Sequence, residues 1–399
     1  MKNKQSQKNT HSDWQEVELS DVSVINMGQS PLSSAYNEIK QGLPLIQGNN
    51  DIKNKKTVGN IWTTEITKIA EKGQLILTVR APVGAVGIAH DKVCIGRGVC
   101  AIESEYKPFL WHFLNYFEPK WNTLEQGSTF TAVNSSDIKK IKLRLPLLPE
   151  QNRIVSVLET WDKSIEKLTH KIETKKQIKK ALMQDLLTGN KRLSGFNENW
   201  KSVKLGDITT FKKGKGLPKS EIDSNGKYEA IHYGELFTKY AEYIETVISK
   251  TNSNKNMFLS KRNDILMPTS DVTPRGLSTA SYLDKDGVVL GGDILVIRSL
   301  GDLNGLFFCY IVNMNKKEVI KLVSGSTVFH LYGSDMAKFN LKLPPLKEQE
   351  SIVKILVMAD REIKELEKKL TFFKEQKRYL LNNLITGKIR TPETLSTKS

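Results

Sequence analysis

Apolar residues recur with a four–three spacing in two long stretches of this chain. The first stretch runs from Leu145 to Gly189, and the second runs from Leu343 to Gly387. The second repeats the first at a constant offset of 198 residues, without a gap. A four–three apolar repeat predicts a helix whose seam packs on a partner helix. Prolines near both starts and a glycine at each end fit helix boundaries.

The seam positions of the two stretches correspond one to one. Two unrelated amphipathic helices would also carry apolar stripes, but they would share neither one offset nor the lysines Lys179 and Lys377 at equivalent seam positions. The predicted seam consists of Leu158, Trp161, Ile165, Leu168, Ile172, Leu182 and Leu186 in the first copy, and Leu356, Ile363, Leu366, Leu370, Phe373, Leu380 and Leu384 in the second.

The connection between the helices predicts their direction. The segment 190–342 leaves the end of the first helix and returns at the start of the second. Because the ends of a compact domain usually lie close together, the helices are expected to run antiparallel. The predicted fold class is α+β, with two β-rich globular domains separated by a two-helix antiparallel coiled-coil rod and a pseudo-two-fold internal repeat.

The β-rich domains also repeat. Residues 13–30 match residues 199–216, so that Trp14 pairs with Trp200 and Gly28 with Gly214. Short apolar runs that break at glycine or proline predict strands and tight turns. We predict a flexible start at 1–12, a first domain at 13–145, a helical spacer at 146–190, a second domain at 191–342, a second helical spacer at 343–390 and a flexible tail at 391–399.

Each domain closes with a shared element, residues 126–146 and 324–344. Both copies carry Gly-Ser-Thr, at 127–129 and 325–327. Such a turn lets backbone N–H groups and hydroxyls approach a phosphate. A plain turn before a strand explains the pattern equally well.

Composition narrows the class of partner. The net charge is +16, and the lysines are spread over both domains and the helices, which favours nucleic acid or another anionic surface. The cysteines Cys94, Cys100 and Cys309 form no metal or disulfide pattern and suit a reducing compartment. With no apolar run of membrane-span length, a cytoplasmic location is expected.

Motifs for catalysis are missing from the sequence. The nearest candidate for a phosphate-binding loop, Gly214–Ser220, lacks the second Gly-Lys. No HExxH, GxSxG, Rossmann fingerprint or clustered metal-ligand pattern occurs, and the histidines are scattered. A binding module is therefore favoured over an enzyme.

The paired helical repeats resemble those of the specificity subunit of type I restriction–modification systems. The resemblance extends from Trp14 to Gly387. Its most specific part is the "LP…EQ…IV" opening of each helix, which carries Glu150 and Gln151 in the first copy and Glu348 and Gln349 in the second. The Gly-Ser-Thr to Leu-Pro element that precedes each opening is also typical of this family.

The resemblance implies a DNA-recognition role in phage defence. Two target-recognition domains would each read one half of a split double-stranded DNA target. The helices would act as a spacer and dock two modification (methyltransferase) subunits, which two restriction (translocase–nuclease) subunits then join. The chain itself would be non-catalytic, within a complex that methylates adenine and cleaves DNA with ATP. S-adenosylmethionine, ATP and Mg²⁺ would bind to the partner subunits, with no cofactor and no metal in this chain.

The family's base-reading residues cannot be transferred residue by residue, so the candidate contacts come from chemistry. Arginine reads guanine and amides read adenine, whereas lysine and hydroxyls more often hold phosphates. The candidates are basic, amide and hydroxyl residues on loops beside glycine: Gln47, Asn49, Asn50, Lys53, Lys55, Lys56, Arg80, Arg97, Ser128 and Thr129 in the first domain, and Lys212, Lys213, Lys215, His232, Arg275, Arg298, Ser326 and Thr327 in the second.

Helix length predicts the span between the two domains. A helix over 161–187 spans about 40 Å, comparable to the roughly 34–36 Å of one DNA turn. Two alternatives stay open: a coiled-coil scaffold or nonspecific nucleic-acid binder, and an enzyme without a recognisable motif. The pairs Glu150/Gln151 and Glu348/Gln349 either fix the entry of the chain into the helix or contact a partner, with capping the simpler interpretation.

Overall fold

The computed structural model describes residues 13–125, 133–253 and 255–394 and has a mixed α+β architecture, as predicted. The chain divides into two compact units. Unit 1 comprises residues 1–169 and 368–399, and unit 2 comprises residues 170–367. Among the described residues, no helix is long and apolar enough to cross a membrane.

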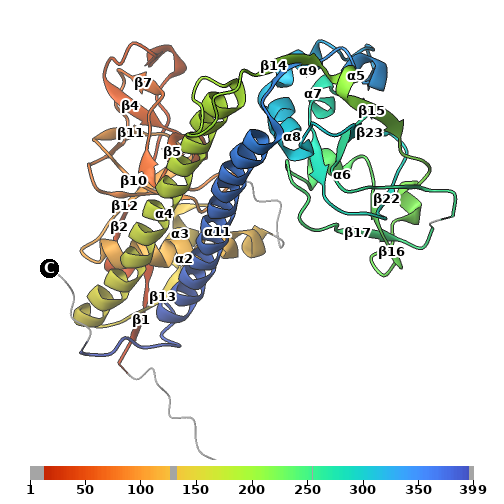
Figure 1. Ribbon diagram of the computed structural model, residues 1–399. Coiled ribbons are helices and arrows are strands. Elements are labelled where there is room, and N and C mark those ends of the chain that lie inside the picture. Colours follow the sequence, from red (N-terminus) through yellow and green to blue (C-terminus); the bar gives the residue numbers. More distant parts are fainter. Residues whose placement is uncertain (1–12, 126–132, 254, 395–399) are drawn as a thin grey trace, which may run out of the picture. The chain divides into compact units, whose positions relative to one another are not determined.

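The two repeated stretches form long helices (Figure 1). Helix α4 spans Leu148–Thr188 and α11 spans Leu346–Leu384. Each helix ends before a glycine in the left-handed region, Gly189 (φ +74°) or Gly387 (φ +70°), where a side chain would be strained. Helix α4 starts in unit 1 and ends in unit 2, whereas α11 starts in unit 2 and ends in unit 1.

Unit 1 contains two larger sheets. Their strand orders are β2-β12-β9-β10-β6-β5 and β3-β7-β4-β11-β8. The strands are β2 (Val24–Met27), β3 (Tyr36–Asn37), β4 (Leu43–Ile46), β5 (Ile52–Lys53), β6 (Lys56–Thr57), β7 (Ile61–Thr63), β8 (Ile69–Ala70), β9 (Leu75–Thr78), β10 (Val86–Ile88), β11 (Val93–Ile95) and β12 (Val99–Glu103). The helices are α1 (Leu19–Val22), α2 (Lys107–Glu125) and α3 (Ser135–Lys139), with 3-10 turns η1 (Ser33–Ala35) and η2 (Asn49–Asp51).

Unit 2 also contains two larger sheets, in the orders β15-β23-β19-β21 and β17-β16-β22-β18, together with the pair β20-β24. The strands are β15 (Thr209–Lys213), β16 (Tyr228–Ile231), β17 (Ser249–Thr251), β18 (Phe258–Leu259), β19 (Asp264–Pro268), β20 (Ser270–Asp271), β21 (Ser281–Leu283), β22 (Val289–Leu290), β23 (Ile294–Ser299) and β24 (Phe329–His330). The helices are α5 (Leu205–Ile208), α6 (Glu235–Thr238), α7 (Pro274–Leu277), α8 (Gly305–Met314), α9 (Lys316–Ile320) and α10 (Gly333–Met336), with the 3-10 turn η3 (Lys219–Glu221).

A two-stranded ribbon ties the start of each domain to the strand that leads into its long helix. In unit 1, β1 (Gln15–Glu18) pairs antiparallel with β13 (Lys142–Leu145). In unit 2, β14 (Lys201–Lys204) pairs with β25 (Asn340–Leu343) in the equivalent register. Strands β1 and β14 lie in the matched segments 13–30 and 199–216 of the domains that the sequence predicts to be β-rich.

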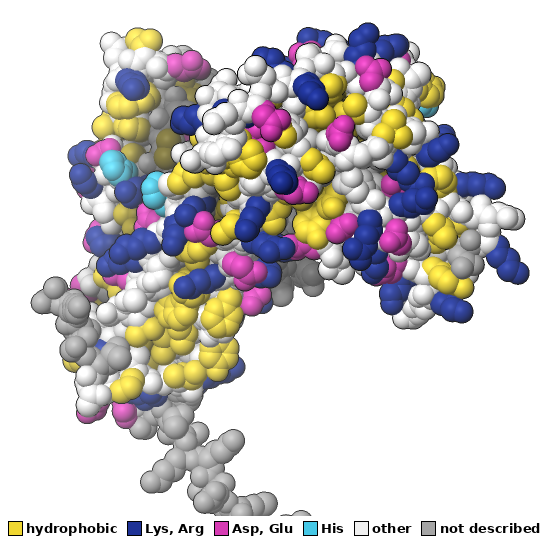
Figure 2. All heavy atoms as spheres, viewed as in Figure 1, with side chains coloured by type: hydrophobic (Ala, Val, Ile, Leu, Met, Phe, Trp, Pro, Cys, Tyr) yellow, Lys and Arg dark blue, Asp and Glu magenta, His cyan; other side chains and the backbone are white. Residues whose placement is uncertain are grey.

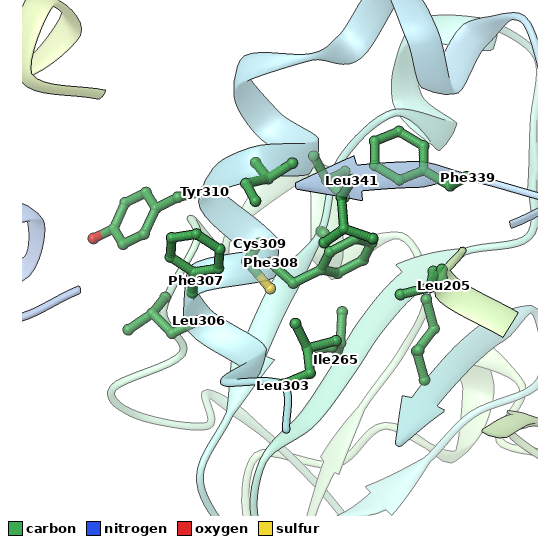
Figure 3. Packing of buried hydrophobic residues seen from close by; sticks show 14 of the residues in the cluster. Leu205, Ile265, Leu303, Leu306, Phe307, Phe308, Cys309, Tyr310, Phe339 and Leu341 are labelled. Carbon is green, nitrogen blue, oxygen red and sulfur yellow. The ribbon is translucent and has the colours of Figure 1, made fainter. Parts of the chain in front are cut away.

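Each unit packs a domain helix between its sheets and the long helices. In unit 2 that helix is α8, where Phe307, Phe308 and Cys309 are fully buried. Figure 3 shows Phe308 and Cys309 facing Ile265 and Leu303, while the Tyr310 ring is directed away from them. Helix α2 of unit 1 occupies the equivalent sequence position and contributes Phe109, Leu110 and Leu114 to its own core. The cores therefore fix the strand ends from which the loops project.

Candidate nucleic-acid interface

Three loops of unit 1 meet at one edge of the sheets. Strands β4 and β11 run parallel, so both end at this edge. The Gly96 N–H donates to the Ile46 carbonyl at 2.8 Å, which joins the β11–β12 turn to the segment after β4. The Val79 N–H donates to the Gly98 carbonyl at 2.9 Å, which adds the segment after β9.

Glycines make this close approach possible. A Cβ on Gly28 would lie 2.1 Å from the Gly96 carbonyl oxygen, and a Cβ on Gly98 would lie 1.9 Å from the Gln47 carbonyl oxygen. Neither position admits a side chain without moving backbone. The predicted contacts Gln47, Arg80 and Arg97 therefore belong to backbone segments that touch one another.

Unit 2 builds the same junction from its own loops. The Gly291 N–H donates to the Ile231 carbonyl at 3.0 Å, and the Thr269 N–H donates to the Asp293 carbonyl at 2.8 Å. A Cβ on Gly214 would lie 1.9 Å from the Gly291 carbonyl oxygen. The pairing of Gly28 with Gly214 in the sequence thus corresponds to one repeated backbone contact.

The structure places many of the predicted contacts on or beside these loops. The gathered residues are exposed in unit 1, and in unit 2 they are exposed except for half-buried His232. They are Gln47, Asn49, Asn50, Arg80 and Arg97 in unit 1, and Lys212, Lys213, Lys215, His232, Arg275, Ser326 and Thr327 in unit 2. No DNA is present, so their contacts with bases or phosphates stay predictions.

Other predicted contacts lie elsewhere or bind protein groups. Arg298 donates from Nε to Asp264 at 2.8 Å and from its terminal nitrogen to the Leu259 carbonyl at 2.9 Å. Its guanidinium therefore neutralises a fully buried carboxylate. Lys55 pairs with Asp162 on α4 at 2.7 Å. The exposed Lys53 and Lys56 flank Lys55 on the β5–β6 hairpin, whereas Ser128 and Thr129 lie outside the described residues.

The second Gly-Ser-Thr element forms a closed turn. Ser324 and His330 exchange backbone hydrogen bonds of 3.0 and 2.7 Å around it. Gly325 has φ +110°, and Ser326 and Thr327 are exposed. A plain turn explains the backbone conformation of this element. Contact between its exposed hydroxyls and a phosphate stays a prediction.

Sequence reasoning missed residues that hold these loops. The Ser30 hydroxyl accepts a hydrogen bond from the Arg97 N–H at 3.2 Å, and the Gln29 N–H donates to the Ile95 carbonyl at 2.9 Å. Both residues follow Gly28, the glycine that matches Gly214, and that match was the available signal. Asp293, which pairs with Lys213 at 3.0 Å, was also missed.

Basic side chains are distributed over the surface. Figure 2 shows Lys and Arg interspersed with Asp and Glu on the face in view, with no single basic patch. Many lysines lie close to a carboxylate; Lys285, for example, pairs with Glu229 at 2.6 Å. The local loop chemistry, rather than net charge alone, therefore marks the candidate interface. No cluster of potential metal ligands occurs among the described residues.

In the "Glu-Gln" openings, the glutamates bind distant arginines, which corrects the capping interpretation, whereas the glutamines fix the helix entry, as predicted. Glu150 binds Arg390, which follows α11, at 2.6 Å, and accepts from the Trp14 indole at 3.0 Å. Burial opposes ionisation, but the hydrogen bonds from Arg390 and Trp14 hold the pKa of Glu150 below its usual range. The carboxylate thus joins three distant segments of unit 1.

Unit 2 repeats this anchor with Glu348, Arg192 and Trp200. Glu348 is fully buried and binds Arg192 through both oxygens, at 2.6 and 2.7 Å. The Trp200 indole donates to the same carboxylate at 3.1 Å. Gln349 fixes the helix entry, because its amide donates to the Pro344 carbonyl at 2.9 Å. Gln151 makes the equivalent 2.8 Å bond to Pro146.

Each unit also pairs a seam lysine with an aspartate of the facing helix. Lys377 binds Asp162 at 2.7 Å in unit 1, and Lys179 binds Asp360 at 2.5 Å in unit 2. With Glu150–Arg390 and Glu348–Arg192, these pairs show that the helix segments within each unit run antiparallel. All predicted apolar seam positions are buried or half-buried.

Known proteins similar to this chain belong to one family. The family model described as "Type I restriction modification DNA specificity domain" matches residues 11–179 and 197–371. The MjaX specificity subunit of Methanocaldococcus jannaschii is 37% identical over 187 residues, covering 45% of this chain and 44% of that protein. The MjaVIII specificity subunit of the same organism is 24% identical over 301 residues, covering 71% and 70%.

Solved structures share the fold. A type I restriction–modification S subunit from M. genitalium superimposes with a TM-score of 0.60 at 17% identity, covering 93% of this chain and 96% of that one. A chain from a study of type I complex assembly gives a TM-score of 0.62 at 17% identity, covering 95% and 99%. These identities support the fold alone.

Proposed function

The chain belongs to the type I restriction–modification DNA specificity family, and we propose that each of its units reads one half of a split DNA target through the loops gathered at its sheet edge. Specificity subunits recognise DNA sequence and are not themselves catalytic. The repeated loop junction carries the proposal. Both units bring exposed basic residues to this edge, Arg80 and Arg97 in unit 1 and Lys212, Lys213 and Lys215 in unit 2, which suits contact with base edges and phosphates.

The long helices act as the spacer between the two recognition domains. The antiparallel pairing within each unit and the buried seam support a continuous two-helix coiled-coil rod. Helix α4 is 41 residues long, and a helix of that length spans about 60 Å. We assign the two readers to the boundaries predicted from the sequence, 13–145 and 191–342.

The partners are two modification subunits, which two restriction subunits then join. Internal repetition supports two equivalent docking sites. Unit 1 has a pocket between α2, β13 and the residues after α11, and unit 2 has a pocket at the equivalent positions of α8, β25 and the residues after α4. S-adenosylmethionine, ATP and Mg²⁺ bind to those partner subunits. The complex functions in the cytoplasm.

A methylome comparison tests the function. Cells carrying this chain with its cognate modification subunit are compared with a strain that lacks the chain. The expected result is a split motif, two short sequences around a fixed unread spacer, that disappears on deletion. A continuous motif would contradict the two-reader arrangement. If no motif appears, sequence-independent binding by the purified complex would support the scaffold alternative.

A further inference from the structure

We propose that Lys55 is a positioning residue, which locks the β5–β6 hairpin of the first recognition domain to helix α4 through Asp162. This inference rests on the proposed function. It replaces the sequence-based expectation that Lys55 contacts DNA. The partner of Lys55 is then the spacer helix, and its effect on the DNA is transmitted through the loop that precedes the hairpin.

The hairpin turn carries Lys55 in an unfavourable conformation. Asn54 and Lys55 have φ values of +50° and +68°, the geometry of a tight hairpin turn in which glycine is preferred at the second position. A lysine there costs free energy relative to glycine. The Lys55 side chain offsets this cost, because its ammonium forms an ion pair with the Asp162 carboxylate at 2.7 Å.

The contact is partly shielded and shared. Asp162 also binds Lys377 of α11 at 2.7 Å, so one carboxylate holds both the hairpin and the facing helix. Burial opposes ionisation of Asp162, but the hydrogen bonds from Lys377 and Lys55 keep its pKa low. The Lys55 ammonium also lies 5.8 Å from the Trp111 ring centre, a cation–π distance.

The hairpin is continuous with the candidate reading loop. The Asp51 carboxylate accepts from the Gln47 N–H at 2.7 Å, and its carbonyl accepts from the Val58 N–H at 2.7 Å. The Lys55 carbonyl accepts from the Ile88 N–H at 2.9 Å, which joins the turn to β10. A shift of the turn therefore displaces the segment that carries Gln47 and Asn49.

In unit 2, ion pairs also link the corresponding segment to a long helix, but the acidic residue lies on the segment and the basic residues lie on the helix. Glu245, in the segment between β16 and β17, pairs with Lys364 and, at 3.9 Å, with Arg361 of α11. An acidic residue cannot serve as a phosphate contact. Because the link persists with opposite polarity, anchoring of the loop to the helix is the feature common to both units.

The test is a double-mutant cycle in the purified complex with its modification subunit. Duplexes carry base changes in the first or the second half of the target, and the ratio of affinities for matched and mismatched duplexes measures discrimination. We expect Lys55→Gly and Lys55→Met to lower discrimination at the first half by about tenfold. Discrimination at the second half stays unchanged.

The cycle separates positioning from DNA contact. Asp162→Asn should lower first-half discrimination similarly, and adding Lys55→Met to it should cause little further loss. If Lys55→Met instead weakens binding to every duplex equally, with the same factor in the Asp162→Asn background and a shallower salt dependence, Lys55 is a phosphate contact and the proposal is wrong.

Controls address folding and charge. Lys72→Met removes an exposed charge of the same unit that is not among the predicted DNA contacts and should leave discrimination intact, whereas Lys55→Arg should retain most of it. Lys55→Gly relieves the turn, so its thermal midpoint should not fall sharply even though discrimination does. If the wild-type complex itself shows no sequence preference, the proposed function fails, irrespective of Lys55.

Discussion

At the scale of single residues, the two repeats place different chemistry at the same point. His112 on α2 and Tyr310 on α8 are equivalent positions, and each lies beside a seam aspartate–lysine pair. The Tyr310 hydroxyl donates to Asp360 at 2.6 Å, and burial raises the pKa of the tyrosine well above its usual range. The equivalent histidine of unit 1 is buried as well.

His112 predicts a pH dependence of stability. Burial, assisted by the nearby Lys377 and Lys55 and opposed by Asp162, lowers the pKa of His112 to about 4. The unfolded chain binds this proton near pH 6.5. The contribution of neutral His112 to the free energy of unfolding is therefore fully present above pH 6.5. It is lost as the pH drops toward 4, by on the order of 3 kcal/mol.

The measurement is urea unfolding of the purified chain between pH 7 and 4.5, monitored by circular dichroism. His112→Gln should flatten the dependence over this range, and exposed His170→Gln is the matched control. An identical pH profile for His112→Gln and the parent chain would show that the histidine does not titrate as its burial requires.

Arg80 gives a residue-scale prediction about reading. It is exposed and directly follows Val79, whose backbone belongs to the three-loop junction. Arg80→Ala should relax discrimination at the first half-site by about 1–3 kcal/mol if the side chain reads a guanine. Competition binding with half-site variants measures this. Equal loss at second-half variants would remove Arg80 from the first reader.

At the scale of elements, the seam between the long helices contains both apolar residues and ion pairs. Leu158 is fully buried in the core of unit 1, and Trp161 packs edge-on against Phe373 with ring centres 5.2 Å apart. The seam is interrupted by the Asp162–Lys377 and Asp360–Lys179 pairs. These pairs stabilise one register, because a shift by one turn would leave each half-buried charge without its partner.

The seam prediction is tested by truncation. Leu158→Ala should destabilise the protein by about 2–5 kcal/mol, because it leaves a cavity in a packed core. Ile178→Ala on α4 removes a side chain that is 48% exposed and should cost less than about 0.5 kcal/mol. Urea midpoints of the two variants measure the difference, and equal losses would contradict the assigned seam.

At the scale of the whole molecule, both units combine the start of one long helix with the end of the other. Arg192 follows the first helix and Arg390 the second, yet each binds the glutamate at the start of the other helix. Each unit therefore takes one end from each helix and closes around its own domain. Both long helices pass from one unit to the other, at residues 169–170 and 367–368.

Paired insertions at those two positions test the spacer role. Adding seven residues to each helix preserves the four–three seam and lengthens both by about 10 Å. The unread spacer of the target should then grow by about three base pairs. Methylome sequencing reads the new motif, with both half-sites expected unchanged. An unaltered spacer in a stable, active complex would rule out the helices as the ruler.

The sequence by itself determined the long helices, their equivalent seams, the terminal glycines and the repeat of the β-rich domains. These features follow from local periodicity and from two constant offsets, 198 residues for the helices and 186 residues for the starts of the domains. The match of Gly28 with Gly214 was visible in the sequence, but the structure supplied its reason, because only glycine fits where two backbones nearly touch.

The tertiary structure decided what the polar side chains do. Lys55 and Arg298 look like their exposed neighbours in sequence, but Asp162 and Asp264 reach them from distant segments. Glu150 resembles a capping residue, yet Arg390 lies 240 residues away and becomes its partner only in the folded unit. Periodicity reports which side of an element is buried, whereas the partner of a charge depends on which segments the whole fold brings together.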